Sequence, residues 1–165
     1  MKTIKLSAAV LIFLTAFTTA RSQNSVGFDA GLKEAKSSGK MVLLDVYSDS
    51  DNWSKKMDAE VLSTERVKSA LSGIVFIRLN IDQSGKYNYN GKSYSTSELA
   101  KLFGGTGYPS FSFMNPDGSI IKFKYNGDEV INISGFISEE DFTEMIDFFK
   151  SGNYKSTDLS TIFTN

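Results

Sequence analysis

Apolar residues recur along the chain with two different spacings, and the spacing changes at glycines and polar turns. Phe28, Leu32 and Ala35 lie four and three residues apart, which is the period of a helix with one buried face. The continuous apolar runs at 41–47 and 74–81 instead predict two buried strands. Each run is short and is followed by polar residues, as expected for a strand that ends at the surface.

The segment between these two strands predicts a helix in two parts. Met57 and Val61 lie four residues apart, and Val67 and Leu71 repeat that spacing after a break near Ser63. A helix that joins two buried strands is typical of a βαβ unit, in which the strands are parallel. We therefore expect the strands at 41–47 and 74–81 to lie in one sheet.

The second half of the chain predicts a helix, a hairpin and a closing helix. Ser95, followed three residues later by Glu98, has the pattern of a capping box at a helix start. Strands at 111–114 and 120–125 are expected to pair across the Asn-Pro-Asp-Gly turn at 115–118. Asn90-Gly91 predicts a type I′ turn and Asn126-Gly127 a further turn, Ser138 caps the closing helix, and that helix has a core-facing stripe of Phe142, Met145, Ile146 and Phe149.

The order of elements predicts an α/β protein. A βαβ unit and an antiparallel hairpin form a mixed central sheet, with helices on both faces. A length of 165 residues suits one domain. We assign this domain to residues 23–152 and expect the Ser/Thr-rich tail at 153–165 to be loosely ordered.

The N-terminus has the pattern of a secretory signal peptide. Two lysines precede Leu6–Ala20, which is uncharged and mostly apolar. This run is short for a membrane span, which needs roughly 20 residues. Cleavage after Ser22 gives a signal peptide of residues 1–22, and cleavage after Ala20 is an alternative, as is a retained membrane anchor. We expect the mature protein to be extracytoplasmic, periplasmic or secreted, and free of the membrane after cleavage.

Composition excludes several kinds of chemistry. The chain has no cysteine, which rules out disulfides, thiol nucleophiles and thiolate metal sites. It has no histidine, which rules out Ser-His-Asp and Cys-His catalysis. The formal net charge of −1 does not indicate a nucleic-acid surface. The acidic residues Asp49, Asp51, Asp58 and Glu60 lack the spacing of a calcium loop, and we expect no metal and no cofactor.

From Val26 to Lys150 the chain resembles the thioredoxin superfamily, especially its secreted thiol–disulfide interchange proteins. In those relatives a buried strand leads to Cys-x-x-Cys and then Lys-Lys-Met on a helix. Here the same frame holds Asp51-Asn52-Trp53-Ser54, and Lys55, Lys56 and Met57 follow. We refer to residues 51–54 as the substituted motif. The resemblance implies that the frame of the redox site is kept although both sulfur atoms are missing.

Three further positions match the superfamily. Asp45 lies six residues before the substituted motif, where the family has a buried aspartate. Arg78 begins the run 78–82, which resembles a family run that begins with a lysine near that aspartate. Because a buried carboxylate is costly unless it is paired, we expect an ion pair between Asp45 and Arg78 that keeps Asp45 ionised. Pro109 corresponds to the family's cis-proline, which faces the site loop.

The resemblance and the residues together indicate a binding module with no dithiol activity. A thiolate is required for disulfide exchange, and Asp51 offers only a good helix N-cap. Family members hold extended peptides beside the cis-proline, so we expect an extended polypeptide or a protein partner. The residues expected to line this groove are Trp53, Tyr108, Pro109, Ser110 and Tyr47.

Three alternatives remain open from the sequence. Whole-chain similarity by itself indicates a thiol–disulfide oxidoreductase. A carboxylate-dependent enzyme would use Asp51 or Asp49 as a general base, although a helix N-terminus lowers the basicity of a carboxylate. The Tyr87, Tyr89 and Tyr94 cluster either contacts a partner or packs locally as a hydrophobic staple.

Overall fold

A mixed four-stranded sheet forms the centre of the protein. The structure is a computed structural model that describes residues 25–163. The strand order is β2-β1-β5-β8. β1 (Val42–Tyr47) pairs in parallel with β2 (Val75–Asn80) and antiparallel with β5 (Ser110–Met114). β8 (Ile133–Ser134) pairs antiparallel with β5 and forms one edge of the sheet.

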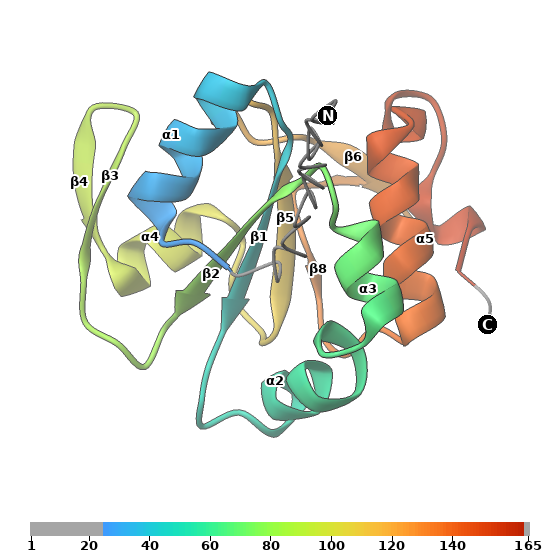
Figure 1. Ribbon diagram of the computed structural model, residues 1–165, viewed down its shortest axis with the longest axis horizontal. Coiled ribbons are helices and arrows are strands. Elements are labelled where there is room, and N and C mark those ends of the chain that lie inside the picture. Colours follow the sequence, from blue (N-terminus) through green and yellow to red (C-terminus); the bar gives the residue numbers. More distant parts are fainter. Residues whose placement is uncertain (1–24, 164–165) are drawn as a thin grey trace, which may run out of the picture.

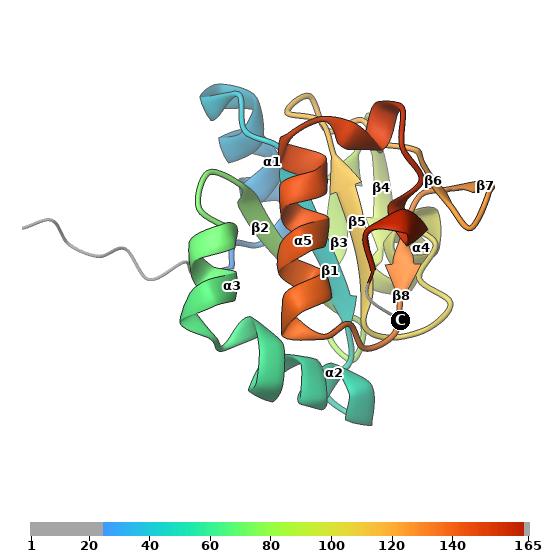
Figure 2. The ribbon, with the colours of Figure 1, turned by 90° about the vertical axis from the view of Figure 1, so that its right-hand side faces the viewer.

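Helices cover both faces of this sheet, which confirms the predicted fold class (Figure 1). α1 (Phe28–Ser38) and α4 (Thr96–Leu102) lie on one face. α3 (Glu65–Ala70) and α5 (Glu139–Lys150) lie on the other, and Figure 2 shows both in front of the strands. α2 (Asn52–Met57) lies at the end of the sheet where β1 ends, so the substituted motif is placed at that edge.

Alternation along the strands produces two hydrophobic cores. In β1, Val42, Leu44 and Val46 face α1 and α4, whereas Leu43 packs among residues of α3 and α5. This is the two-residue period of a strand that is buried on both faces. Asp45 shares the second face with Leu43, so its carboxylate enters the α5 side of the core.

The predicted two-part helix between β1 and β2 is confirmed. α2 continues into a π-helical turn, η1 (Asp58–Leu62), which ends at Ser63. Thr64 then caps α3 by accepting a hydrogen bond from the Val67 backbone N–H at 3.3 Å. The break at 63–64 allows the chain to turn between the site edge and the face that α3 covers.

The turn and cap signals in the middle of the chain are also confirmed. β3 (Lys86–Tyr89) and β4 (Lys92–Ser95) form a hairpin whose turn is Asn90-Gly91. Both turn residues have positive φ, 50° and 75°, as a type I′ turn requires. Ser95 and Glu98 form the full capping box at the start of α4.

The predicted pairing of 111–114 with 120–125 is correct only next to the turn. Met114 and Ile120 form a single bridge, after which the chain leaves the central sheet. β6 (Phe123–Tyr125) pairs instead with β7 (Asp128–Val130) across Asn126-Gly127. This second type I′ turn closes a separate ribbon, and the outer neighbour of β5 is β8.

The prediction of a loosely ordered tail is wrong for residues 153–163. η2 (Asn153–Lys155) and η3 (Leu159–Thr161) pack beside the β6–β7 ribbon, an arrangement that we call the tail wrap. Leu159 is fully buried in the α5-side core. The Asp158 carboxylate accepts hydrogen bonds from the Asn126 and Gly127 backbone N–H groups at 3.1 and 2.7 Å. A buried leucine and an anchored carboxylate thus fix a segment that its polar composition predicted to be loosely ordered.

The predicted signal peptide, residues 1–22, lies outside the described residues. Within residues 25–163, no helix combines the length and the apolar composition that crossing a bilayer requires.

Candidate functional site at the end of the central sheet

The substituted motif begins α2 and uses its first residue as the cap. Asp51 lies just before the helix, and its Oδ1 accepts a hydrogen bond from the Ser54 backbone N–H at 2.7 Å. An aspartate in this position satisfies a free helix N–H and interacts favourably with the helix dipole. The Asp51 carboxylate is therefore engaged in holding the start of α2.

Ser54, the last residue of the substituted motif, is turned inward. Its side chain is buried, and its Oγ accepts a hydrogen bond from the Ser48 backbone N–H at 3.3 Å. The Asp51 backbone N–H donates in turn to the Ser48 carbonyl at 3.2 Å. The first and last residues of the substituted motif thus take part in the hydrogen bonds that close the loop 48–51.

The same loop is tied to the end of β2 by two polar residues that the sequence did not indicate. Asp82 accepts hydrogen bonds at 2.9 Å from both the Ser48 hydroxyl and the Ser50 backbone N–H. These hydrogen bonds, the Ser48 hydroxyl first, lower the pKa of the Asp82 carboxyl. Asn80 donates from Nδ2 to Asp49 Oδ2 at 2.5 Å, so Asp49 is also held in a fixed polar contact.

Below the loop, the Asp45–Arg78 ion pair expected from the sequence is present. Strand register places the two residues directly opposite each other on β1 and β2. Arg78 Nε lies 2.8 Å from Asp45 Oδ2, and its Nη2 lies 2.7 Å from Asp58 Oδ1. The guanidinium also lies over the Tyr47 ring, 3.7 Å from its centroid. We call the region of residues 45–58 and 78–82 the motif edge.

The protonation behaviour of Asp45 differs from the expected permanent carboxylate. Asp45 is fully buried, and burial raises the pKa of its carboxyl to about 7 although Arg78 opposes this shift. Its Oδ1 has no hydrogen-bond partner among the described residues. Burial therefore outweighs the single ion pair in setting the pKa of this carboxyl.

Asp58 is a part of this network that sequence reasoning missed. It begins the π-helical turn η1 directly after α2, and its contact with Arg78 connects that turn to β2. The available signal was the position of Asp58, seven residues after Asp51 on the same predicted helix. Charge spacing by itself does not say which face of a helix meets a distant strand.

The cis-proline loop lies at the same end of the sheet. The Tyr108–Pro109 peptide bond is cis, and the next residue, Ser110, pairs with Val46 of β1. The Pro109 carbonyl accepts a hydrogen bond from the Gly135 backbone N–H at 2.8 Å. Because β1 runs from Val46 into the loop that Ser54 closes, the register brings this proline loop to the substituted motif.

The proposed groove residues do not form one exposed surface. Pro109 and Ser110 are buried, and the Ser110 hydroxyl accepts a hydrogen bond from Asn132 Nδ2 at 2.8 Å. Tyr108 packs against the α1-side core, and Tyr47 lies under the Arg78 guanidinium. The expected lining by Ser110 is therefore wrong, and the expected aromatic rim of Trp53, Tyr108 and Tyr47 is divided among different environments.

Trp53 instead packs with two residues from outside the predicted rim. Its ring lies 6.1 Å from that of Phe136, a half-buried residue before α5. The Lys56 ammonium lies 4.4 Å from the Phe136 ring centroid and 5.6 Å from that of Trp53. Trp53 remains 53% exposed, and we call these three residues the Trp53 platform. Phe136 has no periodic signal, because it lies in the loop between β8 and α5.

The tyrosine cluster of the β3–β4 hairpin packs locally. Tyr89 is buried, its ring lies 6.0 Å from that of Phe28, and its hydroxyl donates to the Gly118 carbonyl at 2.9 Å. Tyr87 also contacts Phe28 edge-on at 6.0 Å. These contacts favour the staple interpretation, since the aromatic rings fasten the hairpin to α1.

The described part of the chain contains no cluster of side chains suited to bind a metal ion. Residues 25–163 contain no group of three or more His, Cys, Asp or Glu side chains arranged to hold an ion. At the motif edge the carboxylates of Asp51, Asp58 and Asp82 are each occupied by backbone, guanidinium or hydroxyl donors.

Comparisons with known proteins agree with this architecture. A model of the thioredoxin-like domain family matches residues 28–150. The thiol:disulfide interchange protein DsbD of Vibrio cholerae is 26% identical over 124 residues, which are 75% of this chain. The chain spans only 18% of the length of that relative.

Solved structures show the same fold. A thioredoxin-fold protein from Helicobacter pylori has a TM-score of 0.62 and 18% identity, covering 81% of this chain and 89% of its own. A thioredoxin from Thermus thermophilus has a TM-score of 0.56 and 21% identity, with coverages of 78% and 88%. The oxidoreductase DsbH has a TM-score of 0.52 and 14% identity, with coverages of 94% and 96%.

Proposed function

Because this chain belongs to the thioredoxin-like domain family and has no cysteine, we propose that it is a redox-inactive, extracytoplasmic module that binds an extended polypeptide. The signal-peptide pattern at residues 1–22 supports the location outside the cytoplasm. Binding would take place beside the cis-proline loop, on the surface that the Trp53 platform supplies.

The observation that carries this proposal is the exposure of Trp53 at the start of α2. Of the large apolar side chains in residues 25–163, only Trp53 and Leu102 are exposed, by 53% and 39%. Trp53 also contacts Phe136 and Lys56, so its ring has packing partners although about half of the side chain stays exposed. Ordered, exposed aromatic side chains of this kind are enriched among the anchors of protein interfaces.

The absence of thiol chemistry follows from composition and supports a binding function. Disulfide exchange needs a thiolate, and none of the 165 residues is a cysteine. The carboxylates considered as a general base, Asp51 and Asp49, are bound to the Ser54 backbone and to Asn80. A general base must be free to reach a substrate proton, so these contacts argue against the carboxylate-dependent enzyme.

The single tryptophan provides a direct test, since Trp53 is the only one in the chain. Reduced, carboxymethylated ribonuclease A is an unfolded polypeptide that lacks tryptophan, so its binding can be followed by Trp53 fluorescence. We expect saturable binding and a spectral shift of Trp53. Insulin-reduction assays are expected to give no rate above a protein-free control.

Two variants complete the experiment, with binding read from the anisotropy of a labelled polypeptide. Trp53→Ala should weaken binding by about tenfold or more, as for an aromatic interface anchor. Leu102→Ala, which removes the other exposed large apolar side chain, is the matched control and should leave the affinity unchanged. Equal affinities for Trp53→Ala and the unmodified protein would exclude the Trp53 platform as the binding surface.

A further inference from the structure

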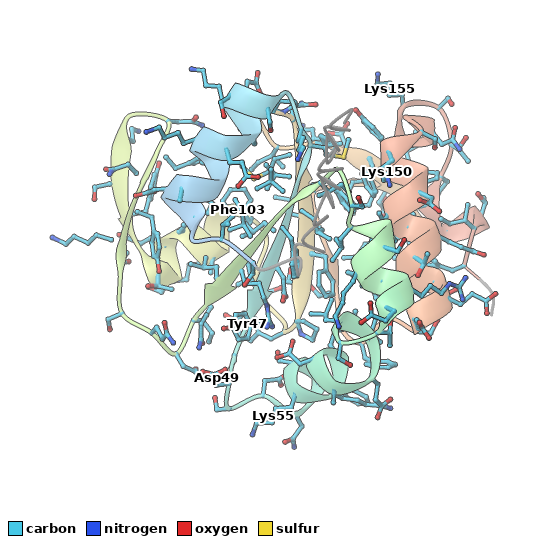
Figure 3. The ribbon with its side chains drawn as sticks, in the orientation of Figure 1. Tyr47, Asp49, Lys55, Phe103, Lys150 and Lys155 are labelled. Carbon is cyan, nitrogen blue, oxygen red and sulfur yellow. The ribbon has the colours of Figure 1, made fainter. Side chains whose placement is uncertain are left out.

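A concavity lies between β6 and η2, far from the motif edge. Figure 3 shows the labelled Lys155 at one end of the molecule and Tyr47, Asp49 and Lys55 at the other. The concavity has a volume of about 330 Å³, and we call it the tail pocket. Its lining residues are Lys122, Phe123, Lys124, Glu129, Tyr154, Lys155, Ser156 and Thr157.

The tail pocket has an excess of positive charge that its own carboxylate does not neutralise. Glu129 lies 2.8 Å from the Lys122 ammonium, and this ion pair leaves no net charge. Lys124 and Lys155 form no ion pair with any residue of the described chain. The nearby Asp158, whose backbone forms a bridge with that of Lys124, has its carboxylate engaged by the Asn126 and Gly127 backbone N–H groups.

Two hydroxyl groups add free donors to the same wall. Ser156 and Thr157 are exposed, and neither side chain hydrogen-bonds to another residue within 25–163. Their backbone N–H groups donate to the Asn153 carbonyl at 3.1 and 3.0 Å. The backbone is thus held in position while the two hydroxyls remain available to a ligand.

Aromatic side chains form an apolar part of the lining. The Tyr154 ring stacks on Phe149 with centroids 5.3 Å apart, which fixes its orientation. The Lys155 ammonium lies 5.7 Å from the centroid of the Tyr154 ring. Phe123 contributes to the lining from a largely buried position. A ligand can therefore place a charged group on the lysines and an apolar body on Tyr154.

We propose that the tail pocket binds a phosphate monoester that carries a small apolar group. Lysine ammonium groups act as point charges and suit a tetrahedral oxyanion, whereas planar carboxylates are recognised best by arginine, which the pocket lacks. The Ser156 and Thr157 hydroxyls donate to the remaining phosphate oxygens. The volume is within the range of small-molecule sites.

The test uses phenyl phosphate as the probe and backbone amide NMR of the full protein as the readout. Saturable shifts are expected for the amides of 122–124 and 154–157, and they should weaken as the sodium chloride concentration is raised. Inorganic phosphate should bind more weakly, and phenol should not bind. Phenol binding as strongly as phenyl phosphate would overturn the assignment of an anion site, and equal affinity for inorganic phosphate would overturn the apolar contact.

Lysine variants locate the charge contacts. Lys124→Gln and Lys155→Gln should each weaken phenyl phosphate binding by about fivefold, as expected for one solvent-screened charge contact. Lys86→Gln, on the exposed β3–β4 hairpin, changes the net charge equally and should have no effect. If Lys86→Gln weakens binding as much as the pocket variants, the interaction is with overall charge and the proposal fails. Thermal unfolding of each variant checks that the fold is retained.

Discussion

The motif edge and the tail wrap are both held by aspartates, but the two carboxylates have opposite surroundings. Asp45 lies fully inside the core, and burial raises its pKa to about 7. Asp158 caps η3 near the surface, where hydrogen bonds from Ser160 and from the Gly127 backbone lower its pKa to about 2. Desolvation dominates at the first site and donor groups dominate at the second.

This difference separates the part of the chain that the family model matches from the segment that follows it. At the motif edge a buried aspartate, its arginine partner and a cis-proline loop surround a motif that has no thiol. The tail wrap lies beyond residue 150, where the family match ends. The region within the family match therefore contains a buried charged group, whose desolvation is unfavourable. The segment after residue 150 is instead held by surface hydrogen bonds and one buried leucine.

The largest expected effect is the loss of the guanidinium at the motif edge. Arg78→Met leaves Asp45 and Asp58 without their cation and removes the contact with Tyr47. We expect the free energy of unfolding at pH 7 to fall by about 4 kcal/mol, the scale for breaking a buried ion pair on one side. Chemical denaturation measures this loss.

Two control variants show whether the loss of stability is specific to the Arg78 guanidinium. Arg78→Lys keeps the charge but cannot reach both carboxylates in a fixed fork, so an intermediate loss is expected. Arg66→Met, on the exposed side of α3, should change stability by less than about 0.5 kcal/mol. If Arg78→Met matches Arg66→Met, the network contributes nothing and the contrast with the tail wrap disappears.

The tail wrap should show a smaller but still large effect. Leu159 is fully buried, so Leu159→Ala removes apolar contacts and leaves a cavity in the α5-side core. We expect a loss of about 3 kcal/mol in the free energy of unfolding. Ile162→Ala, in the same segment but only partly buried, should cost less. A loss near zero for Leu159→Ala would mean that the tail is not part of the cooperative fold.

Most of the frame could be predicted because its signals are local or repeated. The capping box at Ser95 and the type I′ turns at 90–91 and 126–127 each depend on a few adjacent residues. The Asp45–Arg78 pair was predictable because both residues interrupt apolar strand runs, and a buried charge needs a partner. Strand register then placed the two residues opposite each other.

The remaining features depend on contacts between distant segments that leave no pattern in the sequence. β8 has only two residues, which is too short to show an alternation of apolar and polar positions. The sequence therefore does not predict its pairing with β5. Phe136 and Asp58 acquire their roles only when loops from different elements meet. The tail has a single fully buried apolar residue, Leu159, among polar residues, and its composition therefore predicted a loosely ordered segment.

A moderate effect is expected from pH at the motif edge. Between the ordinary carboxyl pKa of 3.8 and the folded-state value of about 7, the folded protein binds a proton that the unfolded chain releases. The contribution of Asp45 to stability is thus complete below about pH 4 and is lost as the pH rises through 7. Relative to Asp45→Asn, the unmodified protein should lose about 1 kcal/mol per pH unit in this window.

Denaturant titrations at several pH values measure this difference. Asp128→Asn, at an exposed position of β7, serves as the matched control and should show no such slope. A constant difference between the unmodified protein and Asp45→Asn from pH 4 to 8 would mean that Asp45 stays ionised. The Arg78 contact would then outweigh burial, and the two aspartates of the comparison would behave alike.

The smallest expected effect is at Asp158 and is confined to one turn. Asp158→Asn retains one acceptor oxygen in place of a carboxylate that serves Ser160, Asn126 and Gly127. Because the site is at the surface, we expect faster amide hydrogen exchange at Asn126 and Gly127 with unchanged exchange in β1. The lowered pKa adds a second signature in the unmodified protein, since the carboxylate contacts are complete above about pH 4 and are lost only as the pH falls through about 2. Faster exchange throughout β1 would show that the turn is coupled to the whole fold, as the motif edge is.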